Sequence, residues 1–378
     1  MKSHFFTCFL PLAACLPLLQ ACTLVKDTTV GHFALPSLPP ASGAIVQAGV
    51  AAPFAGIHHG VILLAGGSNF QERPLAEGGE KCYHDHVYIL HNYSQETVRW
   101  EVSHVKFPNK AAHGVSISTP QGVVCIGGKN AERHFSDVWL MRWNYYSYTV
   151  EIETMPALPY NNADMGGALV NNRIYLAGGA INGKAGNRCI YLELSEDGKK
   201  EWQPLPGFPG PARLQPAVAA QYDGNETCLY VFGGYDFDVK ANAAPNILTG
   251  GYKFIPSQHR WVAVPAICVD YETRAMVGAS AVSSGRDRIV FLGGVDKTLF
   301  FYDQDIVRQI RQAQSTQDSS LLKELTAQRR HYWLQPPGFF RFNKDIIVYR
   351  TITGTWEKAG VLPCRPFAGA AVINAGDY

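Results

Sequence analysis

The sequence predicts an all-β fold, a six-bladed β-propeller whose sixth blade is incomplete at the C-terminus. Five apolar segments each end in a Gly-Gly pair, at residues 61–67, 123–128, 174–179, 229–234 and 289–294. The first glycines of successive pairs are 61, 51, 55 and 60 residues apart. A strand-forming unit repeated at such a period indicates an array of small sheets. Because one small sheet cannot bury both of its faces, the units should stack and close into a ring.

The third unit shows the expected blade most clearly. Gly166–Val170 is a short apolar strand, and Ile174–Gly179 follows after an Asn-Asn turn, a residue type that tolerates positive φ. Arg188–Leu192 is the third strand and Trp202 marks the fourth. Four short antiparallel strands with regular turn signals are typical of one propeller blade. The late tryptophan recurs at Trp100, Trp202, Trp261 and Trp356, and its bulk suits the gap between neighbouring blades.

The two ends of the chain supply the parts of the sixth unit. Phe367–Ile373 resembles an innermost strand, and no Gly-Gly strand follows it before Tyr378. An outer strand is expected around His32–Ile45, ahead of the first strand of the first blade at Gly49–Ile57. Pairing the two ends in one blade would protect strand edges that are otherwise open to association.

The fifth unit is interrupted by a predicted helical insertion at about residues 296–338. Asp305–Gln312 and Ser319–Leu325 have helical composition, with Ser319 or Ser320 as the N-cap. Two interpretations are open: a wall over the central pocket, or a surface embellishment. Aromatic residues around the insertion favour the wall because they need a surface to cover.

The N-terminus is a targeting segment. Phe5–Leu19 is apolar, follows Lys2, and is too short to span a bilayer. It ends in Leu-Gln-Ala-Cys, which resembles a bacterial lipoprotein box with Cys22 as the lipidated residue. We therefore expect a signal peptide at 1–22, a propeller at 23–378, and export to the periplasm or to a periplasm-facing membrane of a Gram-negative bacterium. The alternative is an ordinary signal peptide in which Cys22 is incidental.

The charge and cysteine patterns argue against a nucleic-acid-binding protein and against a metal site. The net charge is +2 without a basic run, so no nucleic-acid partner is expected, and the membrane is contacted only through a lipid at Cys22. Cys82, His84 and His86 could share one strand face, but nothing completes a ligand set and the strand is expected on the outside, so no metal is predicted. Exported cysteines can form disulfides, but the spacing does not define pairs.

Several cations precede innermost strands at similar offsets. Arg213 and Arg274 lie 20 and 19 residues before the first glycine of the next pair, Lys110 lies 17 before, and Arg365 opens the sixth unit. Cations from several blades that point into one funnel favour an anion, and guanidinium groups suit a carboxylate. In the alternative interpretation these side chains brace the loops between blades.

Two further polar residues are expected at the same mouth. His113 and Gln215 come three and two residues after Lys110 and Arg213. A histidine there could carry protons at neutral pH, although a lone histidine is more often structural. No nucleophile triad or glycosidase-type carboxylate pair is recognisable, so the catalytic residues remain unassigned.

The repeat pattern resembles kelch repeats, and the ordered segments resemble one family in particular. Val50–Ile57 through Leu64–Gly67, His113–Ser116, Leu229–Gly234 and Phe367–Val372 are similar to the N-acetylneuraminate epimerases, which are sialic acid mutarotases with a six-bladed kelch propeller. The similarity spans nearly everything from about 48 to 377, in cyclically permuted order, and the helical insertion has its counterpart in that family.

The resemblance implies a cofactor-free periplasmic isomerase that interconverts the α and β anomers of N-acetylneuraminate. The substrate's carboxylate agrees with a cationic funnel. The family's proposed catalytic Glu and Arg follow the first strand of the sixth unit, and the sequence ends at Gly376–Tyr378 before any matching residue, so we expect a longer protein. A non-catalytic propeller that binds carbohydrate or protein is the rival interpretation, and genomic neighbours would separate the two.

Overall fold

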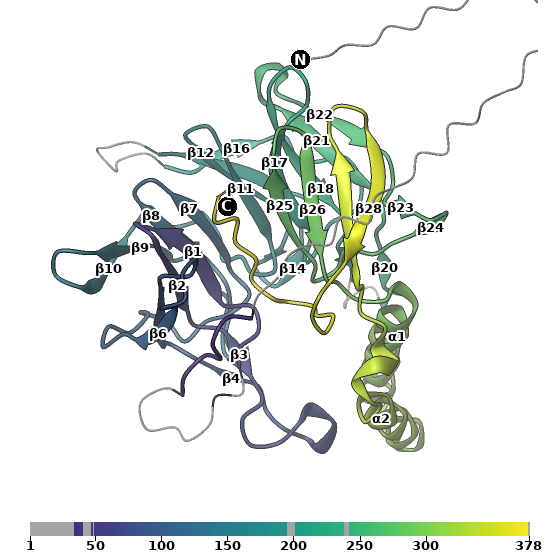
Figure 1. Ribbon diagram of the computed structural model, residues 1–378. Helices are drawn as coiled ribbons and strands as arrows, with labels where there is room; N and C mark the ends of the chain where they lie inside the picture. Colours follow the sequence, from purple (N-terminus) through teal and green to yellow (C-terminus); the bar gives the residue numbers. More distant parts are fainter. Residues whose placement is uncertain (1–33, 41–46, 48, 195–200, 238–241, 377–378) are drawn as a thin grey trace, which may run out of the picture.

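Five four-stranded antiparallel sheets are arranged around a central axis in the computed structural model (Figure 1), which describes residues 34–40, 47, 49–194, 201–237 and 242–376. The first three sheets are β1 (Phe54–His58), β2 (Val61–Ala65), β5 (Val87–His91), β6 (Arg99–Val102); β7 (Val115–Thr119), β8 (Gly122–Ile126), β9 (Val138–Asn144), β10 (Thr149–Thr154); and β11 (Gly166–Val170), β12 (Arg173–Ala177), β15 (Cys189–Glu193), β16 (Gln203–Leu205). The other two are β17 (Ala217–Tyr222), β18 (Thr227–Phe232), β21 (Gly251–Ile255), β22 (Arg260–Val264); and β25 (Ser280–Ser284), β26 (Arg288–Leu292), β27 (Asp345–Arg350), β28 (Thr355–Val361).

Contacts between first strands show which strand of each blade is innermost. β1 contacts β7, β7 contacts β11, β11 contacts β17 and β17 contacts β25. The hydrophobic core lies between consecutive blades, where for example Phe54 and Leu63 of one blade share a buried cluster with Val123 of the next. Four short hairpins extend the blades: β3 (Ser68–Asn69) with β4 (Cys82–Tyr83), β13 (Ala180–Ile181) with β14 (Lys184–Ala185), β19 (Tyr235–Asp236) with β20 (Asn246–Ile247), and β23 (Cys268–Val269) with β24 (Glu272–Thr273). The predicted all-β propeller is therefore confirmed.

Each Gly-Gly pair directly follows the second strand of its blade, and both glycines of every pair have positive φ. The second glycine uses its N–H to reach the neighbouring blade. In four of the five pairs it donates to a carbonyl of the loop that leads into the next inner strand: Gly67 to Ala111, Gly128 to Asn162, Gly179 to Arg213, and Gly294 to Phe367. The glycine pairs are thus the points where one blade is bonded to the next.

Two residues beyond those acceptors, the chain forms a ring of equivalent turns that we call the collar. Its six residues all have positive φ: Ala52, His113, Asp164, Gln215, Gly278 and Gly369. Five consecutive N–H to C=O hydrogen bonds of 2.7–3.0 Å join them in the order Gly278, Gly369, Ala52, His113, Asp164, Gln215. Since β17 contacts β25, the two ends of this series belong to neighbouring blades.

Described segments from the N-terminal and C-terminal parts of the chain lie against the first and fifth blades. The C-terminal segment supplies Phe367 and Gly369 to the bonds just described, and Figure 1 shows it passing between β25 and β1. At the other end, the Pro36 carbonyl accepts a hydrogen bond from the Trp100 indole at 2.9 Å. The same bond joins consecutive blades elsewhere: Trp202 to Pro156, Trp261 to Pro206 and Trp356 to Pro265. The predicted placement of the tryptophans between blades is confirmed.

The terminal segments are not the strands that the sequence predicts. Residues 367–373 hold their place through separate bonds, such as Ser280 Oγ donating to the Ala370 carbonyl, but they have no ladder partner among the described residues. Residues 34–40 are extended without strand pairing, and the rest of the predicted outer strand lies outside the described residues. The first strand begins at Phe54 rather than Gly49, because 49–53 serves the collar.

Two helices interrupt the fifth blade between β26 and β27. They are α1 (Lys297–Ser315) and α2 (Ser319–Trp333), followed by the 3₁₀ turn η3 (Pro337–Phe340). Asp296 caps α1, and Asp318 caps α2 by accepting from the Leu321 N–H. The N-cap is therefore Asp318, and not Ser319 or Ser320, because the carboxylate at 318 already reaches the free amide. In Figure 1 both helices project from the same end of the ring as the β3–β4 hairpin.

Signal peptide and Cys22 lie outside the described residues. Within the described residues all six cysteines are free thiols. No helix in this part of the chain is long and apolar enough to cross a bilayer.

Alanine at Gly127 tests the blade junction. Gly127 has φ +58°, and a Cβ there would lie 2.4 Å from the Asn162 carbonyl oxygen. We expect Gly127→Ala to reduce the free energy of unfolding by roughly 1–3 kcal/mol from backbone strain, with more from the clash. Urea unfolding measures this, and Gly338→Ala is the matched control because nothing lies within 4 Å of its added Cβ. Equal stability of the two variants would contradict the assigned role of the glycine pairs.

Candidate functional site

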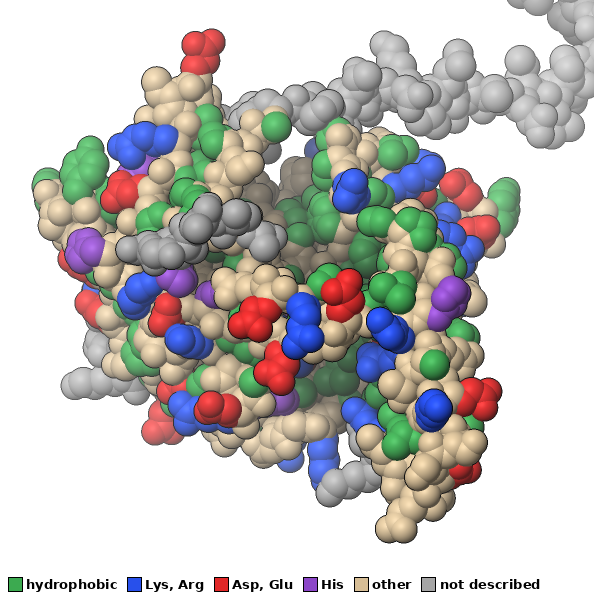
Figure 2. All heavy atoms as spheres, turned by 90° about the horizontal axis from the view of Figure 1, so that it is seen from below, with side chains coloured by type: hydrophobic (Ala, Val, Ile, Leu, Met, Phe, Trp, Pro, Cys, Tyr) green, Lys and Arg blue, Asp and Glu red, His purple; other side chains and the backbone are tan. Residues whose placement is uncertain are grey.

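A cavity of about 1150 Å³ opens between the helical insertion and the loop of the first blade, with the collar as its floor. Collar residues His113 and Gln215 line the floor, Trp333 and Phe340 come from the insertion, and Leu75 comes from the 3₁₀ turn η1 (Leu75–Glu77). α2 and η1 contact each other. Figure 2 shows this face from below, with a hollow between the helices and the neighbouring loops and charged side chains of both signs around it. The insertion is therefore a wall of the cavity.

Asp164 joins the polar residues of the floor, although it does not itself line the cavity. It is a collar residue and its side chain is 7% exposed. His113 Nδ1 lies 3.1 Å from one carboxylate oxygen, and Gln215 donates from Nε2 to the same oxygen at 3.2 Å. The Lys129 ammonium pairs with the other oxygen. Lys129 is placed by its position directly after a glycine pair, and the collar residues Ala52, His113, Asp164 and Gln215 come from the first four blades.

The charge of Asp164 is stabilised although the carboxylate is buried. Burial favours the neutral acid, but the hydrogen bond from His113 and the positive charge of Lys129 outweigh it and hold the pKa of Asp164 below its ordinary range. An ionised Asp164 makes His113 Nδ1 the protonated nitrogen. His113 Nε2 is then buried without a hydrogen-bond partner in the described structure. Buried polar atoms are nearly always paired, so this nitrogen marks a place that a ligand hydroxyl or a water would complete.

Lys81 is a second cation of the site, at the cavity wall opposite the helices. It directly precedes β4, is exposed, and lies over the Phe70 ring at 5.8 Å from the centroid. Loss of hydration and repulsion from Lys129 lower the pKa of Lys81, and Asp164 opposes the shift. No carboxylate pairs with Lys81 in the part of the chain that is described, so it is available to an anion.

Arg213 does not face the cavity. Its side chain is 2% exposed and donates from Nη1 to the carbonyls of Gly233 and Gly250 at 2.8 and 2.9 Å. The guanidinium also stacks against Phe208 and Tyr252, and burial lowers its pKa. The structure therefore gives Arg213 the bracing role between the third and fourth blades in place of the expected anion contact.

The remaining predicted cations also lie away from the cavity. Arg274 is half-buried and pairs with Glu272 at 3.3 Å and Asp345 at 3.7 Å. Arg365 and Lys110 are exposed, and neither lines the cavity. Similar spacing to the glycine pairs did not predict the direction of these side chains, because the loop conformation decides which side chain faces the axis. Of the predicted residues, only His113 and Gln215 come together at the floor.

Cys82, His84 and His86 belong to the β3–β4 hairpin and the segment after it. His84 Nε2 bonds the Asn69 side chain at 2.9 Å, and His86 lies 3.9 Å from Asp85. Burial is the main cause that lowers the pKa of both histidines. Among described residues, no three His, Cys, Asp or Glu side chains gather as metal ligands would. The hairpin lies beside the cavity rather than on an outer strand, which corrects the prediction.

Sequence reasoning missed Asp164, Lys129 and Lys81. A signal for Asp164 was present, since it and His113 both lie 14 residues before the first glycine of the next pair. Lys129 follows a glycine pair, a position that the repeat could have singled out. Lys81 has no equivalent position in the other repeats, because it lies on a loop that only the first blade has in this form.

Replacing Asp164 tests the buried charge. We expect Asp164→Asn to reduce the free energy of unfolding by about 3 kcal/mol at pH 7, as when one partner leaves a buried ion pair. Because the folded-state pKa is lowered, Asp164 stabilises the fold above its unfolded pKa of about 4, and this contribution is lost as the pH falls further. The difference from the wild type should therefore shrink between pH 5 and pH 3 in urea unfolding.

The control for this prediction is Asp270→Asn. Asp270 is exposed, so its substitution should change stability by less than about 0.5 kcal/mol at every pH. A pH-independent loss in Asp164→Asn would contradict the ionised state of Asp164.

Replacing Arg213 separates bracing from binding. Arg213→Met leaves two carbonyl acceptors without their charged donor, so we expect a loss of about 3 kcal/mol in the free energy of unfolding. The exposed Arg365→Met should lose less than about 0.5 kcal/mol. Affinity for an anionic sugar, measured by calorimetry on folded protein, should change less than twofold in both. A tenfold loss of affinity in Arg213→Met at unchanged stability would restore the expected anion contact.

Comparison with known proteins identifies the relatives of this chain. The sequence profile of the N-acetylneuraminate epimerase family matches residues 19–150 and 155–378. The chain is 28% identical over 234 residues to the N-acetylneuraminate epimerase of Haemophilus influenzae (strain PittEE), which covers 61% of this chain and 56% of that protein. It is 29% identical over 233 residues to the N-acetylneuraminate epimerase of Escherichia coli O157:H7, with the same coverage of both.

The matched part spans little more than half the length of these relatives. Among solved structures, YjhT is similar, with a TM-score of 0.55 and 15% identity over 86% of this chain and 87% of that one. This similarity concerns the fold. The profile match, in contrast, extends over most of the sequence, and by it the chain belongs to the N-acetylneuraminate epimerase family.

Proposed function

We propose that this protein is an isomerase that interconverts the α and β anomers of N-acetylneuraminate. The observation that carries the proposal is the Asp164–His113 pair on the collar, at the floor of a large cavity, in a chain of the N-acetylneuraminate epimerase family. The pair offers an oriented imidazole with one unpaired nitrogen, which is what a proton-transfer site requires.

The reaction needs proton movement and no cofactor. Mutarotation removes the proton of the anomeric hydroxyl and adds one to the ring oxygen, which opens the ring to the keto form. Rotation about the bond to the former anomeric carbon and reclosure then give the other anomer. In the proposed mechanism His113 Nε2 accepts the proton of the anomeric hydroxyl and passes it to the ring oxygen as the ring opens. On reclosure His113 takes the proton back from that oxygen and gives it to the new anomeric hydroxyl, and Asp164 stabilises the imidazolium each time it forms.

Binding of the sugar carboxylate is assigned to a different cation from those expected. Lys81 lines the cavity without a carboxylate partner in the described chain, and Lys129 lies beyond Asp164. Gln215 lines the same floor and already donates to Asp164, so it is the proposed neutral contact to a sugar hydroxyl.

We include in this proposal the number of blades in the ring and the cellular location of the protein. A six-bladed ring is supported by the six collar residues, of which Gly369 comes from the C-terminal segment, and by the Trp100–Pro36 bond on the N-terminal side. Export to the periplasm, with or without a lipid on Cys22, is supported by the N-terminal sequence pattern.

Proton NMR tests the proposed activity. Sialidase-released α-N-acetylneuraminate is followed as it converts to the β anomer, with residues 23–378, which do not include Cys22, and with an enzyme-free control. We expect faster conversion with the protein. His113→Gln should reduce the added rate by about 10²-fold or more, because a positioned acid–base group typically contributes that much.

His104→Gln is the matched control, since His104 lies near the side chain of Thr149 and does not line the cavity. It should retain the full rate. Conversion no faster than the enzyme-free control, from folded protein, would remove the isomerase proposal and favour a binding propeller.

A further inference from the structure

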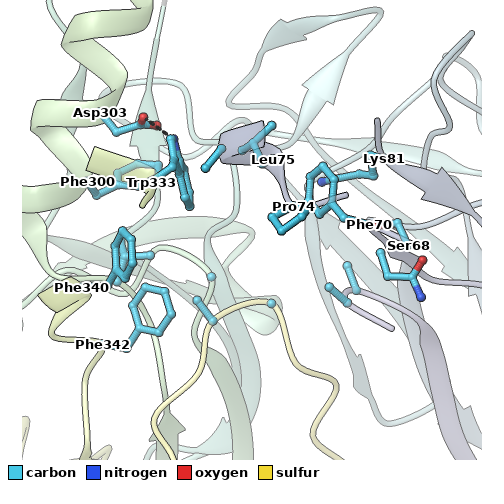
Figure 3. Close-up of a pocket in the computed structure, with 18 of the residues that line it drawn as sticks. Ser68, Phe70, Pro74, Leu75, Lys81, Phe300, Asp303, Trp333, Phe340 and Phe342 are labelled. Atoms are coloured by element: carbon cyan, nitrogen blue, oxygen red, sulfur yellow. Dashed lines mark hydrogen bonds between the residues drawn. The ribbon is translucent and has the colours of Figure 1, made fainter. Parts of the chain in front are cut away.

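One wall of the cavity is aromatic and is held rigidly. Phe300, Trp333, Phe340 and Phe342 of the helical insertion line it, and Figure 3 shows them on one side of the cavity with Leu75, Pro74 and Phe70 on the other. None of these seven side chains carries a charge. A cavity for a sugar needs hydroxyl partners, so a wall of this kind is built for an apolar part of the ligand.

Trp333 is the best fixed member of that wall. Its indole N–H donates to an Asp303 oxygen at 3.0 Å, and Arg329 Nε donates to the same oxygen at 3.0 Å. Asp303 itself is 4% exposed, and Gln304 donates to its second oxygen at 3.2 Å. The indole is thereby held in one orientation before any ligand arrives, which reduces the entropy lost on binding.

The opposite wall places an apolar side chain within reach of α2. Leu75 lies in η1, which contacts α2, and its side chain is 38% exposed although it is apolar. Lys81 lies on the same loop. The cavity thus offers an anion site on one side and an apolar slot between α2 and η1, and it suits a ligand that carries both features.

We propose that Trp333 and Leu75 form an acyl subsite that determines which N-acyl group of the acidic sugar is bound. The inference rests on the proposed function for the identity of the sugar, and it adds that the site distinguishes sugars by their N-acyl group. Because the cavity has a volume of about 1150 Å³ and Leu75 is exposed to it, added methylenes are expected to be buried against Trp333 rather than excluded. Affinity should therefore rise with acyl length, from a hydroxyl at carbon 5 through N-acetyl and N-propanoyl to N-butanoyl.

Calorimetry with this series of free nonulosonic acids tests the subsite. Each methylene buried against the wall should improve the dissociation constant of the wild type about fourfold. In Trp333→Ala the improvement should fall below about 1.5-fold per methylene. Leu75→Ser should weaken it in the same way, and because Leu75 is exposed this variant tests the slot without disturbing the core.

Phe301→Ala is the matched control. Phe301 belongs to α1, is 40% exposed and does not line the cavity, so this variant should keep the wild-type dependence on acyl length. A wild-type affinity that is flat or falls along the series, or an unchanged dependence in both Trp333→Ala and Leu75→Ser, would overturn the acyl subsite.

Failure of the subsite and failure of the isomerase remain distinguishable. Conversion of anomers with a flat acyl dependence would leave the isomerase and remove the subsite. A rising acyl dependence without conversion would leave the subsite and remove the isomerase. Absence of binding by every sugar in the series would remove the subsite as well.

Discussion

The hydrogen-bonded collar is the interaction on which the rest of the structure depends. Each of its residues has positive φ, which turns the chain sharply, and five of the six donate their N–H to the carbonyl of the preceding collar residue. Two of the six positions are glycine, and the other four accept a backbone strain of about 1–2 kcal/mol each. Strain of this kind persists only where the surroundings impose it. Here the surroundings are the glycine pairs of the neighbouring blades, which bond the same loops.

The collar also explains why polar chemistry lies on the axis. A positive φ directs the side chain of a collar residue differently from that of a strand residue, so His113, Asp164 and Gln215 meet although they come from three blades. A buried carboxylate is costly unless it is paired and hydrogen-bonded. Asp164 meets that condition through Lys129, His113 and Gln215, and the same contacts fix the orientation of the imidazole. The contacts that stabilise the floor are therefore the same contacts that orient His113 for the proposed proton transfer.

Sequence alone could predict the parts of the fold that a repeat encodes. The period of the Gly-Gly pairs predicts the repeated blades, and the recurring tryptophans predict the contacts between neighbouring blades. The loss of β pattern after Gly294 gave the helical insertion. The repeat does not show, however, which side chains point into the cavity. Arg213 and His113 stand two residues apart in the repeat register. One is buried between blades and the other faces the cavity, because the positive-φ turn lies at the position of His113 and not at that of Arg213. The strand expected at 367–373 failed for a related reason, since strand pattern without a described ladder partner gives only an extended segment.

The floor and the walls of the cavity are attached to the ring in different ways, so substitutions in them have different consequences. The floor consists of collar residues whose backbone is fixed by its neighbours around the ring, so a change there disturbs several blades. The walls are loops and helices inserted after glycine pairs, and α1 contacts the ring through the loop of the fourth blade, for example where Phe300 meets Tyr235. Trp333 can be replaced without altering a blade junction, whereas Asp164 cannot. A ring of this design can therefore keep one proton-transfer centre while its insertions change the substituents that it accepts. On this reasoning the proposed proton transfer belongs to the collar, and the proposed selection among sugars belongs to α1, α2 and η1.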